Sequence, residues 1–442
     1  MCIVQSRANK MSERLKRFRG ALVGTAVGDA LGTTVEFSPP GSFSPLTDIV
    51  GGGPFNLLPG QWTDDTSMML CLGESLLETR KCDLRDQLRR YVKWYREGHR
   101  SSNGRCFDIG ITVRQALYRF EEDQSDGRCG NTAERSAGNG SLMRLAPVPL
   151  FAFTLASLFD EVSEENLLEH AARLSALSSV TTHGTQMCTD SCLVYGILLA
   201  SAVRGDYANM EEPHKQMLQH DNILALLGEA KVDVDKLHPR VQTIVLDGSF
   251  RTDANIEGSG FVIKSMEAAL WSLFGARDFK DAVLRAANLG KDADTTAAIC
   301  GALAGAVFGE EGIPLEWQNK VTLLPLFQVM GDALCDPSDE HMRRFKAIAM
   351  IIDELESRIN WMSYADRLVS KDNASEIVES EIEQIQQQIE DLQIESESYF
   401  ADSAIPVLRD FLQRAQQAQQ AVRKKRGGMC LLFASLKAKA SS

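Results

Sequence analysis

The chain has 442 residues, enough for one large domain or two, and its hydrophobic fraction of 44% is ordinary for a globular protein. The net charge of −13 argues against general nucleic-acid binding, which needs a basic surface. No run approaches the roughly 18 consecutive apolar residues of a membrane span, and the N-terminal segment lacks the apolar core of a secretory signal. We therefore expect a cytoplasmic protein with no transmembrane segment and no nucleic-acid partner.

Ten cysteines are scattered along the chain without a CxxC pair. In a chain of this size they are expected to be reduced thiols, most of them small core residues. Cys188 and Cys192 are four residues apart and would share a helix face. Packing is the favoured interpretation of this pair, because a zinc site needs further ligands and no second pair accompanies it.

Strand signals are scarce, whereas apolar residues recur at helical spacing along most of the chain. This spacing predicts helices over residues 69–77, 84–94, 111–120, 167–177, 188–203, 261–274, 282–289, 295–308 and 342–355. The segment 297–309 carries Ala or Gly at nearly every turn, which lowers helix propensity but lets neighbouring helices approach closely. The sequence thus predicts an all-α fold, with one compact multi-helix domain over residues 12–360 and polar loops between its helices.

Composition changes after residue 370, where the chain becomes acidic and rich in glutamine. Apolar residues at 378, 382, 385, 389 and 392 form a heptad seam, and a weaker repeat follows Pro406. This pattern predicts a helical extension over 371–426. Two arrangements remain open: a helical hairpin, or a coiled coil that mediates self-association. Residues 427–442 are predicted to be a flexible tail. The basic cluster at 423–426 and the short apolar stretch that follows it suggest weak membrane-surface contact as an alternative.

Three acidic segments are expected where a loop turns into a helix: Glu36, "TDDT" at 63–66 and "DADTT" at 292–296. One Asp or Thr at each place needs no purpose beyond capping a helix. The surplus carboxylates, however, have no Lys or Arg close in sequence except Lys291, and buried charges need partners. Carboxylate and hydroxyl oxygens suit Mg²⁺, Mn²⁺ or Ca²⁺. The residues themselves therefore indicate an oxygen-ligand metal site, with helix capping as the alternative.

Five segments, at 24–37, 62–78, 104–117, 138–150 and 287–309, together resemble the ADP-ribosylglycohydrolase family. They follow the order of that family, and paired "TDD" and "DADT" blocks around a "GNGSLMR" loop are specific to it. Members include an enzyme that removes ADP-ribose from an arginine of a nitrogenase component. The resemblance implies an all-helical fold with a binuclear Mg²⁺ or Mn²⁺ centre. It does not extend beyond about residue 360.

Residue roles follow from the same resemblance. The implied metal ligands are Thr63, Asp64, Asp65, Asp292, Asp294 and Thr295. The implied catalytic residues are Glu36, Asp65 and Asp108. The implied substrate-binding residues are Gly138, Asn139, Gly140, Ser141, Met143, Arg144 and His183. Glycines of the "GNGSLMR" loop would let backbone N–H groups approach a diphosphate. Asp108 could meet a guanidinium bidentately or simply cap a helix, and His183 could face substrate or be structural.

The predicted reaction is hydrolysis of the N-glycosidic bond of ADP-ribosyl-arginine on a modified protein. The same site could instead act on ADP-ribosyl-serine, O-acetyl-ADP-ribose or another ADP-ribose conjugate. A non-catalytic ADP-ribose-binding protein is the third possibility, although such a protein would be expected to lose metal carboxylates. Lys291 departs from the family pattern beside the "DAD" block. It could pair with a surplus carboxylate, contact phosphate or point to solvent.

Overall fold

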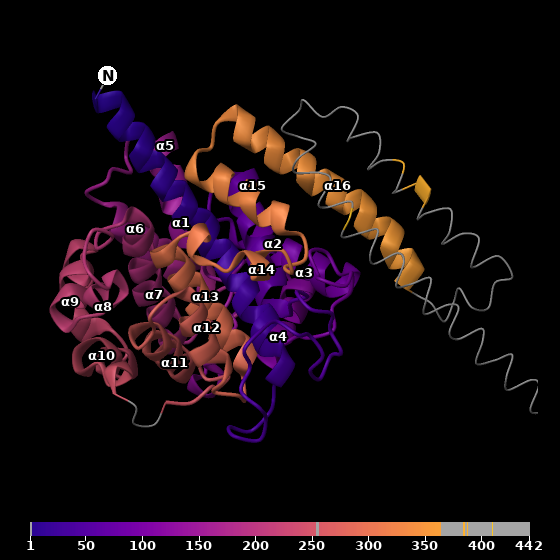
Figure 1. The fold of residues 1–442 in the computed structure, drawn as a ribbon, viewed down its shortest axis with the longest axis horizontal. Coiled ribbons are helices and arrows are strands. Elements are labelled where there is room, and N and C mark those ends of the chain that lie inside the picture. The colour runs from indigo at the N-terminus through magenta and orange to yellow at the C-terminus, as the bar shows by residue number, and fades with distance from the viewer. Residues whose placement is uncertain (1, 253–255, 364–382, 385–386, 388–408, 410–442) are drawn as a thin grey trace, which may run out of the picture. The chain divides into compact units, whose positions relative to one another are not determined.

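In a computed structural model of the chain, the structure describes residues 2–252, 256–363, 383–384, 387 and 409 (Figure 1). The chain divides into two compact units, Met1–Met342 and Arg343–Ser442. The described residues form helices joined by loops, with isolated β-bridges and no sheet. The predicted all-α fold is confirmed. Most of the predicted extension and all of the predicted tail lie outside the described residues, so the domain boundaries, the heptad interpretation and the tail stay predictions.

The α-helices follow one another from the N-terminus with short connections. They are α1 (Cys2–Gly32), α2 (Asp64–Thr79), α3 (Leu84–Glu97), α4 (Ile111–Glu122), α5 (Pro147–Leu158), α6 (Leu167–Ser179), α7 (Gln186–Arg204), α8 (Pro213–Met217), α9 (His220–Glu229), α10 (Pro239–Asp247), α11 (Val262–Phe274), α12 (Phe279–Ala287), α13 (Ala293–Phe308), α14 (Leu315–Gln318), α15 (Leu324–Cys335) and α16 (Asp339–Ser363). Every segment predicted to be helical overlaps one of these.

Helix α1 was not predicted, and its glycines explain why. They recur every fourth residue, at 20, 24, 28 and 32, and glycine weakens a helical pattern. In the structure this row faces α13: a Cβ at Gly24 would lie 2.2 Å from the Gly301 oxygen, and one at Gly28 would lie 2.0 Å from the Ala297 oxygen. Figure 1 shows the indigo α1 running beside the orange α13 through the first unit. The two backbones approach this closely because α1 carries only glycine along the contact and α13 carries only glycine or alanine.

Gly24→Ala is expected to destabilise the protein by about 1–3 kcal/mol, because the added methyl group must push α1 away from α13. Urea denaturation of the full chain measures this. Gly228→Ala in α9 is the matched control, since nothing lies within 4 Å of the Cβ it would add. That control should gain up to about 1 kcal/mol from helix propensity. Equal effects of the two substitutions would show that the close approach of α1 and α13 is not tight.

Helix α7 is the one described helix that is long and apolar enough to cross a membrane by length and composition alone. Of its apolar window, 78% is buried inside the structure, as in the core helix of a globular unit. Cys188 and Cys192 lie buried on this helix as free thiols, and the Cys188 thiol contacts the Gly138 oxygen at 3.2 Å. Packing, the favoured interpretation of this pair, matches their surroundings.

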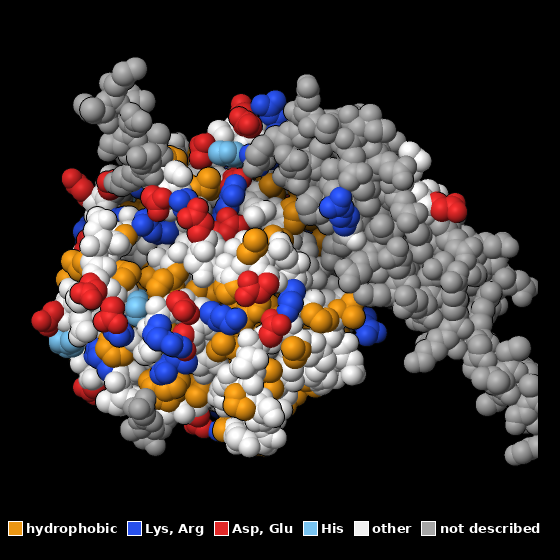
Figure 2. All heavy atoms as spheres, in the orientation of Figure 1, with side chains coloured by type: hydrophobic (Ala, Val, Ile, Leu, Met, Phe, Trp, Pro, Cys, Tyr) orange, Lys and Arg blue, Asp and Glu red, His pale blue; other side chains and the backbone are white. Residues whose placement is uncertain are grey.

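Charged side chains of both signs are interspersed over the visible face of the first unit, with apolar groups scattered between them (Figure 2). No single-sign field dominates that face. The charge of that face alone therefore gives no basis for selecting a partner.

Candidate active site

The acidic segments that are far apart in sequence meet where the C-terminal end of α1, the start of α2 and the start of α13 converge. One group places carboxylate oxygens of Asp29, Asp65 and Asp294 within 4.8 Å of one another. A second does the same for Glu36, Asp292 and Asp294. Asp294 belongs to both groups, which makes it the common member of two adjoining acidic clusters.

Glu36 does not lie at the start of a helix, as the sequence had suggested. It follows a short 3₁₀ turn, η1 (Thr33–Val35), at the end of α1, rather than preceding a helix. The expectation was wrong because the glycine-rich segment before it is itself helical. The Glu36 carboxylate instead accepts hydrogen bonds from the N–H groups of Ala293, at 2.7 Å, and Asp294, at 3.4 Å. It thereby caps α13 from a distant part of the chain.

Asp29 is the residue that sequence reasoning missed. Its Oδ1 accepts from the N–H and the hydroxyl of Thr63, both at 2.9 Å. Its Oδ2 accepts from the N–H of Thr66 at 3.1 Å and from the Thr66 hydroxyl at 2.7 Å. Thr63 makes no side-chain capping bond to α2, so Asp29 caps that helix from α1. A single acidic residue within the small, apolar run "VGDALG" was the available signal.

Asp65 supplies the test of whether these residues suit a cation. Its Oδ1 is buried and has no hydrogen-bond partner, while its Oδ2 lies 3.1 Å from the Thr63 hydroxyl and 3.4 Å from the Thr295 hydroxyl. An orphaned carboxylate oxygen is costly to bury unless it binds something positive. The atoms of both clusters that could bind a metal ion are all carboxylate or hydroxyl oxygens, which are the ligands that hard divalent cations prefer. The residues therefore fit a divalent cation.

The crowding shifts the ionisation of the whole group upward. Burial, with repulsion from neighbouring carboxylates, raises the pKa of Asp64, Asp65 and Asp294 well above the usual range. Burial also raises the pKa of Asp29 to about 6 and that of Glu36 to about 8. Without a counter-ion, Glu36 holds its proton at neutral pH and Asp29 becomes protonated below about pH 6, while the other three carboxylates hold protons to a higher pH than an exposed carboxylate does.

The metal-free protein should therefore become less stable as pH rises. A carboxylate whose folded pKa is raised stabilises the fold below its unfolded pKa and loses that contribution as pH rises through the folded pKa. With Asp29 at about 6 and Glu36 at about 8, the melting temperature in chelator is expected to fall between about pH 5 and pH 8. Millimolar Mg²⁺ or Mn²⁺ should flatten this decline. A melting temperature in chelator that rises over the same interval would contradict the assignment.

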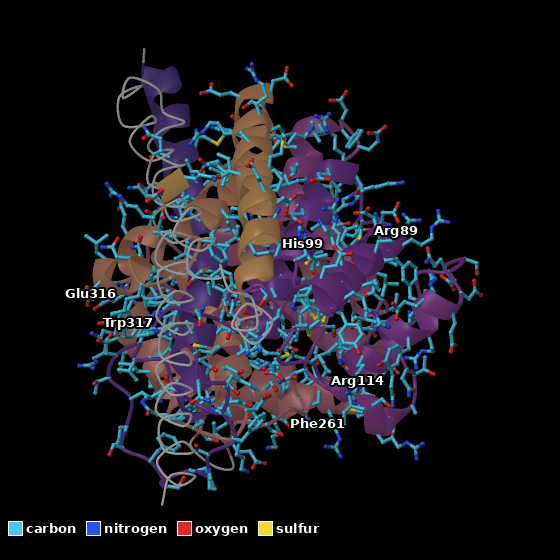
Figure 3. The ribbon with its side chains drawn as sticks, turned by 90° about the vertical axis from the view of Figure 1, so that its right-hand side faces the viewer. Arg89, His99, Arg114, Phe261, Glu316 and Trp317 are labelled. Atoms are coloured by element: carbon cyan, nitrogen blue, oxygen red, sulfur yellow. The ribbon has the colours of Figure 1, made fainter. Side chains whose placement is uncertain are left out.

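Above the clusters opens a cleft of about 480 Å³. Its lining comes from α4, α13 and the loops around them: Glu36, Phe37, Asp64, Asp108, Ile109, Gly110, Ile111, Thr112, Val113, Gly138, Asn139, Gly140, Met143, His183, Gly260, Asp292, Asp294 and Thr295. Figure 3 shows Arg114 of α4 and Phe261, the neighbours of Val113 and Gly260, near each other at the lower edge. Asp64 lines the cleft although it belongs to neither acidic group, and Thr63 and Asp65 are buried without lining it.

The "GNGSLMR" loop divides between the cleft and the core. The Asn139 amide donates to Asp292 Oδ2 at 2.5 Å, and its backbone N–H donates to the Gly260 oxygen. A Cβ at Gly140 would lie 2.8 Å from the His183 ring, so only glycine fits there. Ser141 does not line the cleft, because it is buried and its hydroxyl accepts a hydrogen bond from Ser179. The loop therefore both shapes the cleft and holds one carboxylate of the second cluster.

Arg144 also lies behind the cleft wall, fully buried beneath His183. Its guanidinium donates to the hydroxyls of Thr181 and Thr182 and stacks over the Tyr91 ring. Thr182 accepts from Arg144 and has its own proton free for His183 Nδ1, 2.8 Å away. Burial and the Arg144 charge lower the pKa of His183 to about 3, so the ring is neutral. This relay leaves the ring proton on Nε2, beside Gly138 on the cleft side.

Lys291 directly precedes Asp292 in the chain but belongs to neither acidic cluster and does not line the cleft. Its ammonium forms an ion pair with Glu257. Among the three possibilities open from the sequence, the structure shows pairing, but with a carboxylate outside the metal blocks. The Lys291 backbone also holds the turn after Glu36. Its carbonyl oxygen accepts a hydrogen bond from the Phe37 N–H at 2.6 Å, and its N–H donates to the Ser38 oxygen at 2.7 Å.

The first unit is all-helical and carries, at the base of a cleft, two acidic clusters that could hold a metal ion through oxygen ligands. A sequence profile described as ADP-ribosylglycohydrolase matches residues 10–344. ADP-ribosylarginine hydrolase Tri1 of Serratia proteamaculans is 38% identical over 311 residues, which are 70% of this chain and 76% of that protein. The ADP-ribosyl-[dinitrogen reductase] glycohydrolase of Rhodospirillum rubrum is 30% identical over 313 residues, 70% of this chain and 90% of that protein.

Among solved structures, a chain of an ADP-ribosylglycohydrolase-related protein complex superposes with a TM-score of 0.59 at 37% identity, covering 73% of this chain and 98% of that chain. The chain belongs to the ADP-ribosylglycohydrolase family. It is an ADP-ribosylglycohydrolase enzyme, which confirms the family resemblance and the enzyme prediction.

Proposed function

We propose that this protein hydrolyses the N-glycosidic bond between ADP-ribose and an arginine side chain on a modified protein. The observation that carries the arginine linkage is Asp108, which lines the cleft close enough to Asp64 to raise that residue's pKa. Burial, with Asp29 and Asp292, raises the pKa of Asp108 itself to about 6. Among the described side chains Asp108 has no ion pair with Lys or Arg. A guanidinium would supply that missing charge through two parallel hydrogen bonds.

Relatives support the same linkage. Two of them, from Serratia proteamaculans and Pseudomonas putida, carry the name ADP-ribosylarginine hydrolase Tri1, and each is 38% identical to this chain. Neither name identifies the protein on which this chain acts. We therefore propose the type of bond that is cleaved, the bond to arginine, and not a particular target protein.

We propose two divalent cations, Mg²⁺ or Mn²⁺, held by the two acidic clusters. Asp65 with Thr63 would hold one, Glu36 with Asp292 the other, and Asp294 is placed to serve both. Asp64 and Thr295 complete the proposed ligand set from the cleft side. When bound, such cations polarise substrate oxygens and lower the pKa of a water molecule. Four or more buried carboxylates need roughly that much positive charge.

The chain's own side chains would orient the substrate. The neutral His183 presents an Nε2–H donor beside Gly138, where it can meet an oxygen of ADP-ribose. Asp108 would hold the guanidinium, and Glu36, kept ionised by a bound cation, would take the proton of the attacking water. A C1″–O bond forms, the C1″–N bond breaks, and the guanidine nitrogen regains a proton. Positioning supplies most of the rate, with acid–base catalysis worth about 10²–10⁴-fold.

A turnover panel tests the proposal. ADP-ribose linked to arginine, to serine and to acetate is incubated with the full chain in Mg²⁺, in Mn²⁺ and in chelator, and released ADP-ribose is measured. Release is expected from the arginine conjugate with metal and not in chelator. Faster release from the serine or acetyl conjugate would overturn the arginine linkage. Equal release in chelator would overturn the metal site.

A further inference from the structure

Two exposed apolar side chains line the cleft at its mouth, and two half-buried aromatic rings continue from one of them. Phe37 is 66% exposed and lines the cleft, and the Phe55 ring lies 6.2 Å from it, centroid to centroid. Phe107 continues the row at 5.3 Å from Phe55. Ile111, also 66% exposed, lines the same cleft. We call Phe37, Phe55 and Phe107 the aromatic rim. Phe55 and Phe107 are half-buried, and an exposed ring that adjoins partly exposed rings at the edge of a site is typical of a binding surface.

The backbone holds Phe37 in this exposed position at a cost. Its φ of 62° is left-handed, which is an uncommon and strained conformation for a bulky residue. Two hydrogen bonds with the Lys291 backbone fix the turn, one from the Phe37 N–H and one to the Ser38 oxygen. If the Phe37 ring served only as a core residue, we would not expect a strained turn to hold it exposed to solvent. The rim is therefore tied to the residue that directly precedes the Asp292 cluster.

The position of Asp108 suggests what covers the rim. Asp108 follows Phe107 directly in the chain, and Ile111 comes three residues later. If Asp108 holds the guanidinium of the substrate, the aliphatic part of that arginine and the polypeptide attached to it must leave the cleft past these residues. A free ADP-ribose conjugate would leave the rim bare, whereas a modified protein would cover it.

We propose that the aromatic rim binds the polypeptide that carries the modified arginine, through apolar side chains next to that arginine. This inference rests on the proposed function, because it needs arginine as the linkage. It deepens that function by defining a substrate class: arginines flanked by apolar residues on a protein surface. Aromatic side chains are the ones that most often dominate such contacts.

The test compares three substrates that share one scissile bond: free ADP-ribosyl-arginine, a peptide with ADP-ribosyl-arginine between leucines, and the same peptide with serines in place of the leucines. The variant is Phe55→Ser, because Phe55 belongs to the rim but does not line the cleft. Wild-type kcat/KM is expected to be about tenfold higher for the leucine peptide than for the serine peptide. Phe55→Ser should remove that preference, mainly through KM, and leave free ADP-ribosyl-arginine within about twofold of wild type.

Leu315→Ser is the matched control. Leu315 is 67% exposed and lines a separate groove. In Figure 3 its neighbours Glu316 and Trp317 lie at the left edge, away from Arg114 and Phe261. This control should keep the wild-type preference for the leucine peptide. If Phe55→Ser has a much lower melting temperature than wild type, Phe55→Leu replaces it. This variant keeps an apolar side chain and should keep part of the preference for the leucine peptide.

Each contrary outcome has a distinct meaning. Equal loss on all three substrates would show that Phe55 shapes the cleft itself and would overturn the rim proposal, as would an unchanged preference. A wild-type protein that sediments as a dimer, and as a monomer once Phe55 is serine, would make the rim an interface between copies of this chain. No wild-type turnover of free ADP-ribosyl-arginine, with turnover of the serine conjugate, would refute the proposed function instead.

Discussion

Asp294→Asn is expected to lower kcat/KM for arginine-linked ADP-ribose by about 10²–10³-fold. Asp294 is the member common to both acidic clusters, so its loss removes a charged ligand from each proposed cation. Asparagine keeps the volume and the acceptor oxygen that binds the Thr295 N–H. The melting temperature in chelator should therefore fall less steeply as pH rises, because one of the buried groups that would have to ionise has left the cluster. Initial rates over a Mn²⁺ series, with melting curves, measure both effects.

Asp190→Asn provides the comparison. Asp190 is a partly buried carboxylate of α7 whose Oδ2 accepts from the His238 N–H at 2.6 Å, and it lines no part of the cleft. Its substitution should leave turnover within about twofold of wild type. Activity of Asp294→Asn that stays within threefold of wild type at every Mn²⁺ concentration would remove Asp294 from the site.

The acidic blocks could be predicted from sequence because their signal is local. "TDDT" and "DADTT" each place more oxygens at a helix start than one cap needs, and both helices begin where expected. Their meeting in space could not be predicted in the same way. It depends on α1 lying backbone to backbone with α13, a contact made by glycines whose absent side chains leave little trace in a hydrophobic pattern. Asp29 and Glu36 acquire their roles only through that contact.

The "GNGSLMR" loop shows a second limit. Motif resemblance assigns the whole loop to substrate, yet the structure separates its residues. Backbone N–H groups of Leu142 and Met143 both donate to the Asn139 oxygen, so the loop winds into a turn. Side chains on opposite sides of a turn face opposite ways, which sends Arg144 toward Tyr91 and the core. A motif fixes which residues occur together, whereas the turn decides which of them the substrate can reach.

The last prediction concerns the proton of the Thr63 hydroxyl. That oxygen lies 2.9 Å from Asp29 Oδ1, 3.1 Å from Asp65 Oδ2 and 3.3 Å from Asp294 Oδ2, but it has only one proton to donate. Asp29 is the nearest acceptor, and it also takes the Thr63 N–H. With the proton on that side, the lone pairs of Thr63 face Asp65 and Asp294. Asp29 thus orients a proposed metal ligand without being needed as one.

Asp29→Asn is expected to weaken Mn²⁺ binding by about 10–100-fold. The new amide group has an N–H₂ in place of one acceptor oxygen, and this N–H₂ must face Thr63 or Thr66 groups that donate to the carboxylate. Calorimetric titration gives the affinity, and the Mn²⁺-induced rise in melting temperature gives it independently. Thr66→Val is the matched control, since it removes the 2.7 Å hydroxyl bond to Asp29 Oδ2 and leaves both Thr63 bonds in place. A purely structural Asp29 would lower the melting temperature in chelator in both variants and leave Mn²⁺ affinity unchanged. Loss of affinity in Asp29→Asn alone would instead mean that the direction of one hydroxyl proton, set from α1, governs metal binding at the start of α2.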